Sequence, residues 1–268
     1  MFPFPPPDRT PDSDWLAQRA QDAAASPALL FGDETWSYAE LDARVERQAG
    51  RLYAAGVRAG QHVAVLLRNS PEYIFLIHAL IRLQALLVPL NLRLAADELR
   101  WQIEQSESEW LVYDGNTAQA CADACHGPWQ GLELSGLPAP MAFQAGKIDP
   151  DAPFAILYTS GTTGRPKGVV QSLANHFWSA LASALRLGTL TNDRWLLNIP
   201  LYHVGGLAIP LRCCLYGTCV VLPTLEGHFD ALGVLAEMER SSVTLFPSSR
   251  PCSSACWMPK RRFRRACA

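Results

Sequence analysis

Short apolar runs alternate with longer amphipathic stretches along most of this chain, and this alternation restricts its fold more than any other feature. Residues 62–67, 85–88 and 110–113 are apolar runs of strand length. Residues 70–81 and 97–105 separate them and carry apolar side chains at helical spacing. Strands that alternate with helices form parallel sheets, because each helix crosses back over the sheet before the next strand begins. The sequence therefore predicts an α/β fold of mostly parallel sheets flanked by helices.

Capping residues and glycines mark where several elements begin and end. Ser37 and Glu40 have the spacing of a capping box, and Gly56 is placed to end the helix that follows. A hairpin is expected to turn at Gly32 and Asp33. The other expected elements are a helix within 14–26, strands at 154–158, 195–198, 219–222 and 243–245, a strand just before 173, and helices at 173–187, 205–215 and 229–239. Residues 115–150 lack periodicity, so we expect an irregular connection there.

Composition and charge limit the function classes. The 268 residues are 49% apolar and 18% charged, which is typical of a globular protein with a sizeable core. Six of the 23 basic residues and none of the 25 acidic residues lie in 241–268. The first 240 residues therefore carry 17 basic and 25 acidic groups, a net charge of −8. An acidic body of this kind argues against nucleic-acid binding.

Cysteine spacing and the absence of long apolar runs indicate the compartment. The eight cysteines contain no Cys-x-x-Cys pair, so we expect reduced structural thiols and no metal-ligating set. No apolar run approaches the roughly 20 residues of a membrane helix. The start of the chain has neither the basic nor the apolar region of a secretory signal. We expect a cytoplasmic protein without a membrane span, and the sequence does not indicate its oligomeric state.

A loop rich in hydroxyl groups and glycines, within YTSGTTGRPKGVV at 158–170, carries the chemistry. It follows an apolar strand directly and contains one lysine, Lys167. Its candidate phosphate ligands are Thr159, Ser160, Gly161, Thr162, Thr163, Gly164 and Lys167. Backbone amides, hydroxyls and a cation together suit polyphosphate oxygens. The loop is not a Walker A loop, because Lys167 precedes Gly168 and not a Ser or Thr. The alternative interpretation is an ordinary surface turn, which the same residue types favour.

The string TSGTTGRPKG resembles the phosphate-loop signature of the acyl-adenylate-forming superfamily, which includes acyl-CoA synthetases, luciferases and peptide-synthetase adenylation domains. Residues 36–73 and 85–107 are similar to two further blocks of that family. Gln84 is a departure, since a small residue, often glycine, is usual there. The resemblance covers about 14–245 and implies the N-terminal portion of the large adenylate-forming domain.

A second segment, PLYHVGGLAIPLRCCLYGTCVVL at 200–222, resembles the part of these enzymes that lines the acyl pocket. Its His-Val-Gly-Gly form is most similar to the 2-succinylbenzoate–CoA ligases of menaquinone biosynthesis. The resemblance implies that His203 forms a wall between the nucleotide and acyl sites, and that Gly205 and Gly206 leave room for substrate. Arg212 could pair with the second carboxylate of succinylbenzoate. The alternatives are a helix-start histidine, a tight glycine turn and a solvated arginine.

The reaction implied by the resemblance is ATP-dependent activation of a carboxylic acid. The carboxylate attacks the α-phosphate, pyrophosphate leaves, and the thiolate of coenzyme A displaces AMP. ATP, Mg²⁺, CoA and a small carboxylic acid are the implied ligands, with Lys167 and His203 as the catalytic residues and no protein metal ligand assigned. Three alternatives stay open: a fatty-acid or aryl-acid CoA ligase, an enzyme that serves a carrier protein, and a non-catalytic nucleotide-binding or interaction module.

Several parts of the family are missing from the chain, including the adenine-binding motif, an acidic magnesium ligand, the ribose-binding aspartate and the small C-terminal domain. We interpret 1–247 as an incomplete N-terminal AMP-binding domain, inactive alone. Residues 248–268 lack any acidic group or strand or helix period, which is typical of a shifted reading frame. Read from the third base of each codon, Cys256 to Pro259 must encode Leu-Asp-Ala, which suits an amphipathic helix. The alternative is a native basic tail.

Overall fold

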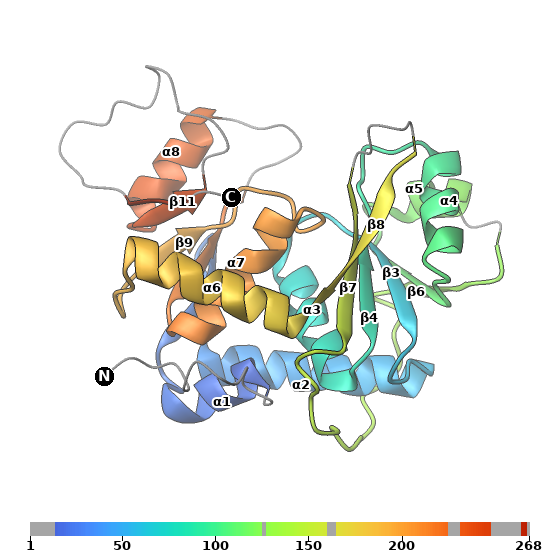
Figure 1. The fold of residues 1–268 in the computed structure, drawn as a ribbon, viewed down its shortest axis with the longest axis horizontal. Coiled ribbons are helices and arrows are strands. Elements are labelled where there is room, and N and C mark those ends of the chain that lie inside the picture. The colour runs from blue at the N-terminus through green and yellow to red at the C-terminus, as the bar shows by residue number, and fades with distance from the viewer. Residues whose placement is uncertain (1–13, 125–126, 160–164, 225–230, 248–263, 267–268) are drawn as a thin grey trace.

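The structure, a computed structural model, describes residues 14–124, 127–159, 165–224, 231–247 and 264–266. Two six-stranded sheets form its framework (Figure 1). The first sheet has the spatial order β12 (Arg264–Ala266), β11 (Leu245–Pro247), β9 (Arg194–Leu196), β10 (Cys219–Leu222), β1 (Pro27–Phe31) and β2 (Glu34–Ser37). The second has the order β6 (Gln130–Glu133), β5 (Trp110–Tyr113), β3 (His62–Leu66), β4 (Leu86–Pro89), β7 (Pro153–Thr159) and β8 (Lys167–Ser172).

Strand direction confirms the predicted fold class. Among the described strands, neighbours are parallel except in two hairpins, β1–β2 in the first sheet and β7–β8 in the second. The β1–β2 hairpin turns at Gly32 and Asp33, as predicted, and Gly32 has a φ of 59°. The five parallel strands β6, β5, β3, β4 and β7 are contiguous in the second sheet. Their carboxyl ends therefore lie along one edge, which is called the carboxyl edge below.

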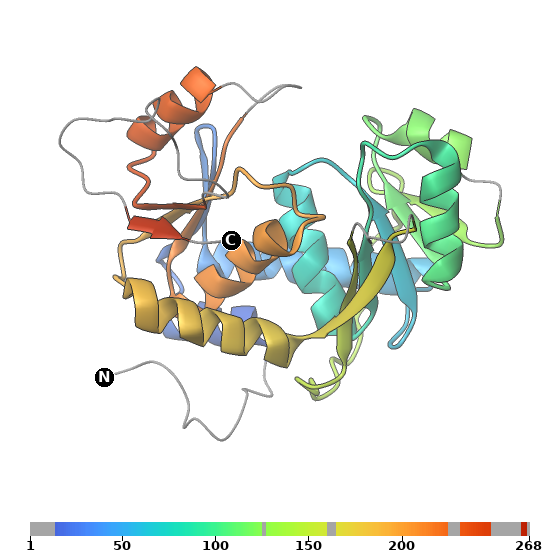
Figure 2. The same cartoon turned by 45° about the horizontal axis from the view of Figure 1, so that its top comes forward.

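Helices cover both faces of each sheet. The helices are α1 (Trp15–Asp22), α2 (Tyr38–Ala55), α3 (Pro71–Leu83), α4 (Ala96–Gln105), α5 (Ala118–Ala124), α6 (Leu173–Leu187), α7 (Val204–Tyr216) and α8 (Ala231–Arg240). Alternate side chains of β3 point to opposite faces: Val63 and Val65 join the core shared with α2, α3, α6 and α7, whereas Ala64 and Leu66 join the core under α4 and α5. The α8 helix covers the outer face of the first sheet. Figure 2 shows α3 (teal) and α7 (orange) side by side between the sheets.

Local sequence signals account for the helix boundaries. The capping box at Ser37 and Glu40 forms as predicted, and Gly56 ends α2 in the left-handed conformation with a φ of 111°. Ser70 caps α3 ahead of Pro71. Gln84 ends α3 with a φ of 54°, in the left-handed region that favours glycine. This conformation is the physical reason why glycine is the more suitable residue at that position.

Two segments differ from the sequence-based expectation. Residues 115–150 contain α5 and β6, where we predicted only an irregular connection. β6 has little apolar character and is held in the sheet by backbone pairing with β5. Its side chains therefore show no alternating pattern from which a strand could be predicted. The tail from 248, predicted to have no strand period, contributes β12, which pairs in parallel with β11. Pairing of this kind needs an open sheet edge but no apolar alternation.

Candidate functional site

The carboxyl edge of the second sheet brings the predicted phosphate loop together with two segments that the sequence analysis did not single out. β3, β4 and β7 are neighbours and parallel, so the residues that follow them lie side by side. They are the segment around Asn69, the turn around Arg93 and the hydroxyl-rich loop after Thr159. Ligands of open α/β sheets bind outside the carboxyl ends of the strands, where the loops diverge. This edge is therefore the candidate functional site.

The hydroxyl-rich loop connects β7 to β8. Thr159 and Lys167 are register partners at the base of this hairpin, and Thr159 Oγ1 donates to the Lys167 carbonyl at 3.4 Å. Sequence reasoning treated Lys167 as a loop residue; the structure corrects this, because Lys167 is the first residue of β8. Its side chain is exposed. The other predicted phosphate ligands, Ser160, Gly161, Thr162, Thr163 and Gly164, lie outside the described residues.

An aromatic residue on α4 contacts both sides of that loop. The Trp101 ring lies 5.9 Å from the Tyr158 ring in an edge-to-face arrangement. The Arg165 guanidinium lies 5.8 Å from the centre of the Trp101 ring, so one side chain touches residues before and after the loop. The Tyr158 hydroxyl donates to the Gln102 carbonyl at 3.0 Å. Sequence reasoning classed Trp101 only as a packing residue, since nothing in its spacing pointed to the loop.

His203 stands at the start of α7 and faces the same edge. It is the residue before the first turn and its ring makes no capping hydrogen bond, so the interpretation as a hydrogen-bonded helix-start histidine is not supported. The ring packs against Tyr202, with centres 4.6 Å apart. Partial burial lowers the pKa of His203, and the positive charge of Arg93 lowers it further. Hydrogen bonds from Asn69, after β3, to Ile199 and Leu201 hold the segment before His203 at this edge.

The two glycines after His203 lie in the first turn of α7. A Cβ on Gly206 would stand 2.2 Å from the carbonyl oxygen of Pro200, so no larger residue fits. Gly206 is buried against its own preceding turn, which supports the tight-turn interpretation for this residue. Gly205 is half-buried. Its contact with substrate stays a prediction.

Arg212 lies away from His203. It follows His203 by nine residues on α7, which places it about 13 Å along the helix and on the opposite side. Its Nη2 donates to Ser179 Oγ on α6 at 2.9 Å, and within the part of the chain the structure describes its buried Nε has no partner. Burial lowers the pKa of Arg212, opposed by Tyr216 and Cys213. Arg212 is thus half-buried between two helices, and its pairing with a substrate carboxylate stays a prediction.

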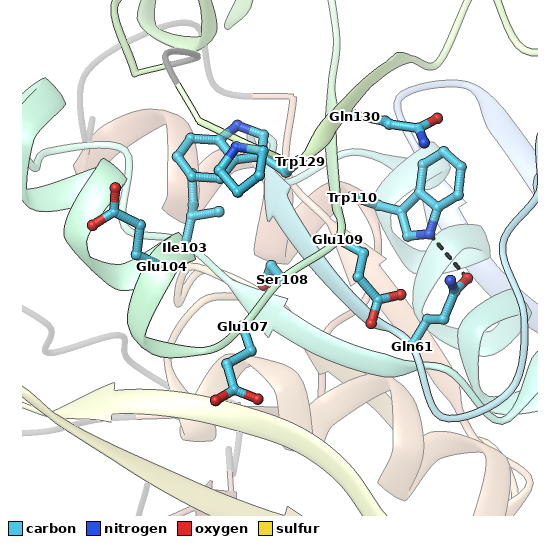
Figure 3. Close-up of a pocket in the computed structure, with 10 residues that line it drawn as sticks. Gln61, Ile103, Glu104, Glu107, Ser108, Glu109, Trp110, Trp129 and Gln130 are labelled. Atoms are coloured by element: carbon cyan, nitrogen blue, oxygen red, sulfur yellow. Dashed lines mark hydrogen bonds between the residues drawn. The ribbon is translucent and has the colours of Figure 1, made fainter.

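Two cavities lie at the other edge of the second sheet. One of about 610 Å³ is lined by residues that include Gln61, Glu107, Trp110 and Trp129 (Figure 3). Another of about 420 Å³ is lined by His62, Gln84 and neighbouring residues. Both adjoin the amino ends of strands, since Gln61 precedes β3 and Trp110 begins β5. Neither cavity contains a residue predicted for the site.

Metal and thiol chemistry find little support in this part of the chain. Among the described residues, no group of three His, Cys, Asp or Glu side chains could hold a metal ion. Cys121, Cys213, Cys214 and Cys219 are buried and form no disulfide. Burial raises the pKa of Cys219 to about 12, which keeps this thiol protonated and unreactive.

Comparison with known families decides the assignment. The AMP-binding enzyme family matches residues 16–256. The chain belongs to the AMP-binding enzyme family. The match covers most of the chain and includes both segments singled out above. It also extends past residue 247, where the altered tail was expected to begin.

Two similar relatives within the AMP-binding family carry the same name. The chain is 37% identical over 236 residues to the 2-succinylbenzoate–CoA ligase of Bacillus subtilis, covering 88% of this chain and 48% of the relative. It is 34% identical over 232 residues to the ligase of that name from Listeria monocytogenes, covering 87% and 48%. The chain therefore spans about half the length of these curated relatives.

Solved structures of the AMP-binding family agree with the fold. The o-succinylbenzoate coenzyme A synthetase of Bacillus subtilis in complex with AMP matches with a TM-score of 0.82 and 37% identity, over 87% of this chain and 61% of that chain. The same enzyme in complex with ATP and magnesium ion matches with a TM-score of 0.82 and 36% identity, over 88% and 49%. These matches confirm the prediction of an N-terminal portion of an adenylate-forming domain.

Proposed function

We propose that this chain is the phosphate-binding part of an ATP-dependent acid–CoA ligase whose acid is 2-succinylbenzoate. The observation that carries the proposal is the convergence of the hydroxyl-rich loop and the segment before His203 on one carboxyl edge. Relatives at 34–37% identity carry the name of this ligase, which supports the choice of acid. We also propose that it works in the cytoplasm. Among the described residues, no helix is long and apolar enough to cross a membrane.

The proposed chemistry is carboxylate adenylation followed by thioester formation. The hydroxyls and amides of 159–164, with Lys167, hold the β- and γ-phosphates while the carboxylate attacks the α-phosphate and pyrophosphate leaves. His203 stands on the acyl side, where partial burial and the positive charge of Arg93 favour the uncharged ring beside the incoming carboxylate. Magnesium supplies charge neutralisation between phosphate oxygens. The CoA thiolate then displaces AMP, so protein groups position the reactants and no protein nucleophile is required.

The choice of acid depends on how the second carboxylate of succinylbenzoate is recognised. We propose Arg212 for this role, because its buried Nε is a donor without a partner in the described part of the chain. The acyl group would then reach the α6–α7 contact where Arg212 meets Ser179. Replacing Arg212 with Ala should raise KM about 30-fold for succinylbenzoate and spare a monocarboxylic analogue. An equal loss for both acids would place Arg212 outside the acyl site.

A panel of acids tests the proposed function. The gene should first be sequenced past codon 247, where the proposal expects an open frame, offset by one base, that encodes the rest of the enzyme. The protein from that frame should release pyrophosphate with succinylbenzoate and ATP, and should transfer the acyl group to CoA. Activity with octanoate but not succinylbenzoate would favour a fatty-acid ligase. Transfer only to a carrier protein, or nucleotide binding without turnover, would favour the other two alternatives.

A further inference from the structure

A single side-chain amide joins the two halves of the candidate site. Asn69 follows β3 and comes just before Ser70, the cap of α3. Its Nδ2 donates to the carbonyl of Ile199 at 3.0 Å, and its Oδ1 accepts from the amide of Leu201 at 2.8 Å. Ile199 and Leu201 belong to the segment that leads from β9 into α7. The bridge therefore links a strand end of the second sheet to the segment that precedes His203.

The chemistry of the bridge explains why asparagine suits the position. An asparagine amide presents a donor and an acceptor side by side, as a peptide group does, so it can pair with a carbonyl and an N–H two residues apart. The residue between them is Pro200, which has no N–H to offer. The Asn69 amide pairs with the carbonyl before Pro200 and with the N–H after it.

The segment 199–203, which Asn69 contacts, is also held in place by contacts at the Pro200 carbonyl. The His203 amide donates to the Pro200 carbonyl at 3.0 Å, and Gly206 packs onto the same carbonyl, where a Cβ would stand at 2.2 Å. Movement of 199–201 would therefore move Pro200, and Pro200 would carry His203 and the first turn of α7 with it. Asn69 is half-buried, which limits competition from water for its two hydrogen bonds.

We propose that Asn69 is a positioning residue that fixes segment 199–203, and through it His203 and the start of α7, against the carboxyl edge of the second sheet. The positioning of segment 199–203 by Asn69 does not depend on any assumed activity. Its catalytic consequence, a correctly placed wall between nucleotide and acyl group, rests on the proposed function. Two helix N-termini, those of α3 and α7, are held side by side by one amide.

The test uses the chain itself and follows the ring of His203 by NMR. Histidine-labelled protein is titrated between pH 4 and 9, and the His203 signal is assigned from its loss in His203→Gln. Asn69→Ala should raise the pKa of His203 toward the ordinary histidine value, because the freed segment leaves both its partial burial and Arg93. The Leu201 amide should also exchange with solvent about tenfold faster, since it loses its acceptor.

Asn175→Ala is the matched control. Asn175 pairs with Ser172 at the start of α6 and has no bond to 199–203, so its loss should destabilise one helix and leave the pKa of His203 unchanged. An unchanged His203 pKa and Leu201 exchange rate in folded Asn69→Ala would overturn the proposal. A shift of equal size in Asn175→Ala would also overturn it, by showing a general loosening.

A milder variant covers the case in which Asn69→Ala does not fold. Asn69→Asp keeps the acceptor for Leu201 and removes the donor to Ile199. Its backbone amide shifts should extend through 199–204, and shifts confined to 67–71 would contradict the proposal. None of these measurements needs ATP or an acid, so failure of the proposed function leaves their outcome unaffected.

Discussion

Lys167 and Thr159 face each other at the base of the β7–β8 hairpin, and their backbones are fixed by strand pairing. The backbone of Lys167 is therefore held in a fixed position, while its side chain is exposed and does not pack in the core. The sequence predicted which residues would meet phosphate from their types and order. It could not predict that Lys167 lies in a strand, because Gly168 and Pro166 beside it are typical of turns. Asn69 carried no motif at all, since its partners are more than a hundred residues away.

Replacing Lys167 with Ala should weaken the binding of Mg·ATP to the chain about tenfold to hundredfold. A charge-assisted hydrogen bond to phosphate contributes roughly 1.5–3 kcal/mol. The free energy of unfolding should change by less than about 0.5 kcal/mol, because the side chain is exposed. Calorimetric titration with Mg·ATP measures the first effect and urea unfolding the second.

Lys147→Ala is the control for that comparison. Lys147 is also exposed and precedes Ile148, which lines a cavity at the amino ends of the strands. Its loss should leave Mg·ATP binding unchanged. Equal weakening by both substitutions would mean that Lys167 acts only through the net charge of the protein.

Helices and strands with strong local signals were predictable almost to the residue. α6 and β10 have the predicted bounds, and α2 begins and ends where Ser37 and Gly56 indicate. Elements placed by pairing alone were not predictable: β6 has a mostly exposed, polar pattern and depends on β5 for its conformation. The hydrogen bond from Arg212 on α7 to Ser179 on α6 is also a tertiary contact, so the helical spacing of the sequence could not predict it.

The end of α3 offers a test at the scale of one element. Gln84 adopts a φ of 54°, in the left-handed region that costs a residue with a Cβ about 1 kcal/mol. Gln84→Gly should therefore raise the free energy of unfolding by about 0.5–1 kcal/mol, after allowance for the greater freedom of glycine in the unfolded chain. Urea unfolding of both proteins at pH 7 is the measurement.

Gly56→Ala is the converse experiment at the end of α2. Its φ is 111°, and an added Cβ would stand 3.2 Å from the Trp110 ring. This substitution should lower the free energy of unfolding by about 1 kcal/mol or more. Destabilisation by Gln84→Gly would show that the Gln84 side chain contributes more by packing than its conformation costs.

The molecule as a whole is a layered structure in which helices between the two sheets hold buried titratable groups. Burial lowers the pKa of His176 to about 4, and the Arg212 charge adds to the effect. Burial lowers the pKa of His78 to about 4 as well; Asp14 opposes this shift and Arg82 adds to it. Both rings are therefore neutral in the folded protein at neutral pH. These two histidines make the free energy of unfolding depend on pH.

Acidification should destabilise the fold through these two histidines. The unfolded chain binds a proton on each near pH 6.5, whereas the folded chain binds it only near pH 4. Stability is thus complete above pH 6.5 and is lost as the pH falls toward 4, by about 2 kcal/mol per histidine between pH 7 and pH 5. In urea unfolding, His176→Leu should remove about half of that loss. An unchanged pH dependence in this variant would show that His176 is not the titrating group.

The central claim is that phosphate binds at the carboxyl edge of the second sheet. The most direct test is a titration of the labelled chain with Mg·ATP, followed by the NMR shifts of its backbone amides. Our account predicts shifts that gather around Asn69, Arg93, Lys167 and His203, which follow neighbouring strands or begin α7. Residues at the opposite edge, such as Gln61 and Glu107 in the cavity of about 610 Å³, should not move. Shifts that gather in that cavity, or saturating Mg·ATP that leaves the carboxyl edge unchanged, would contradict the account.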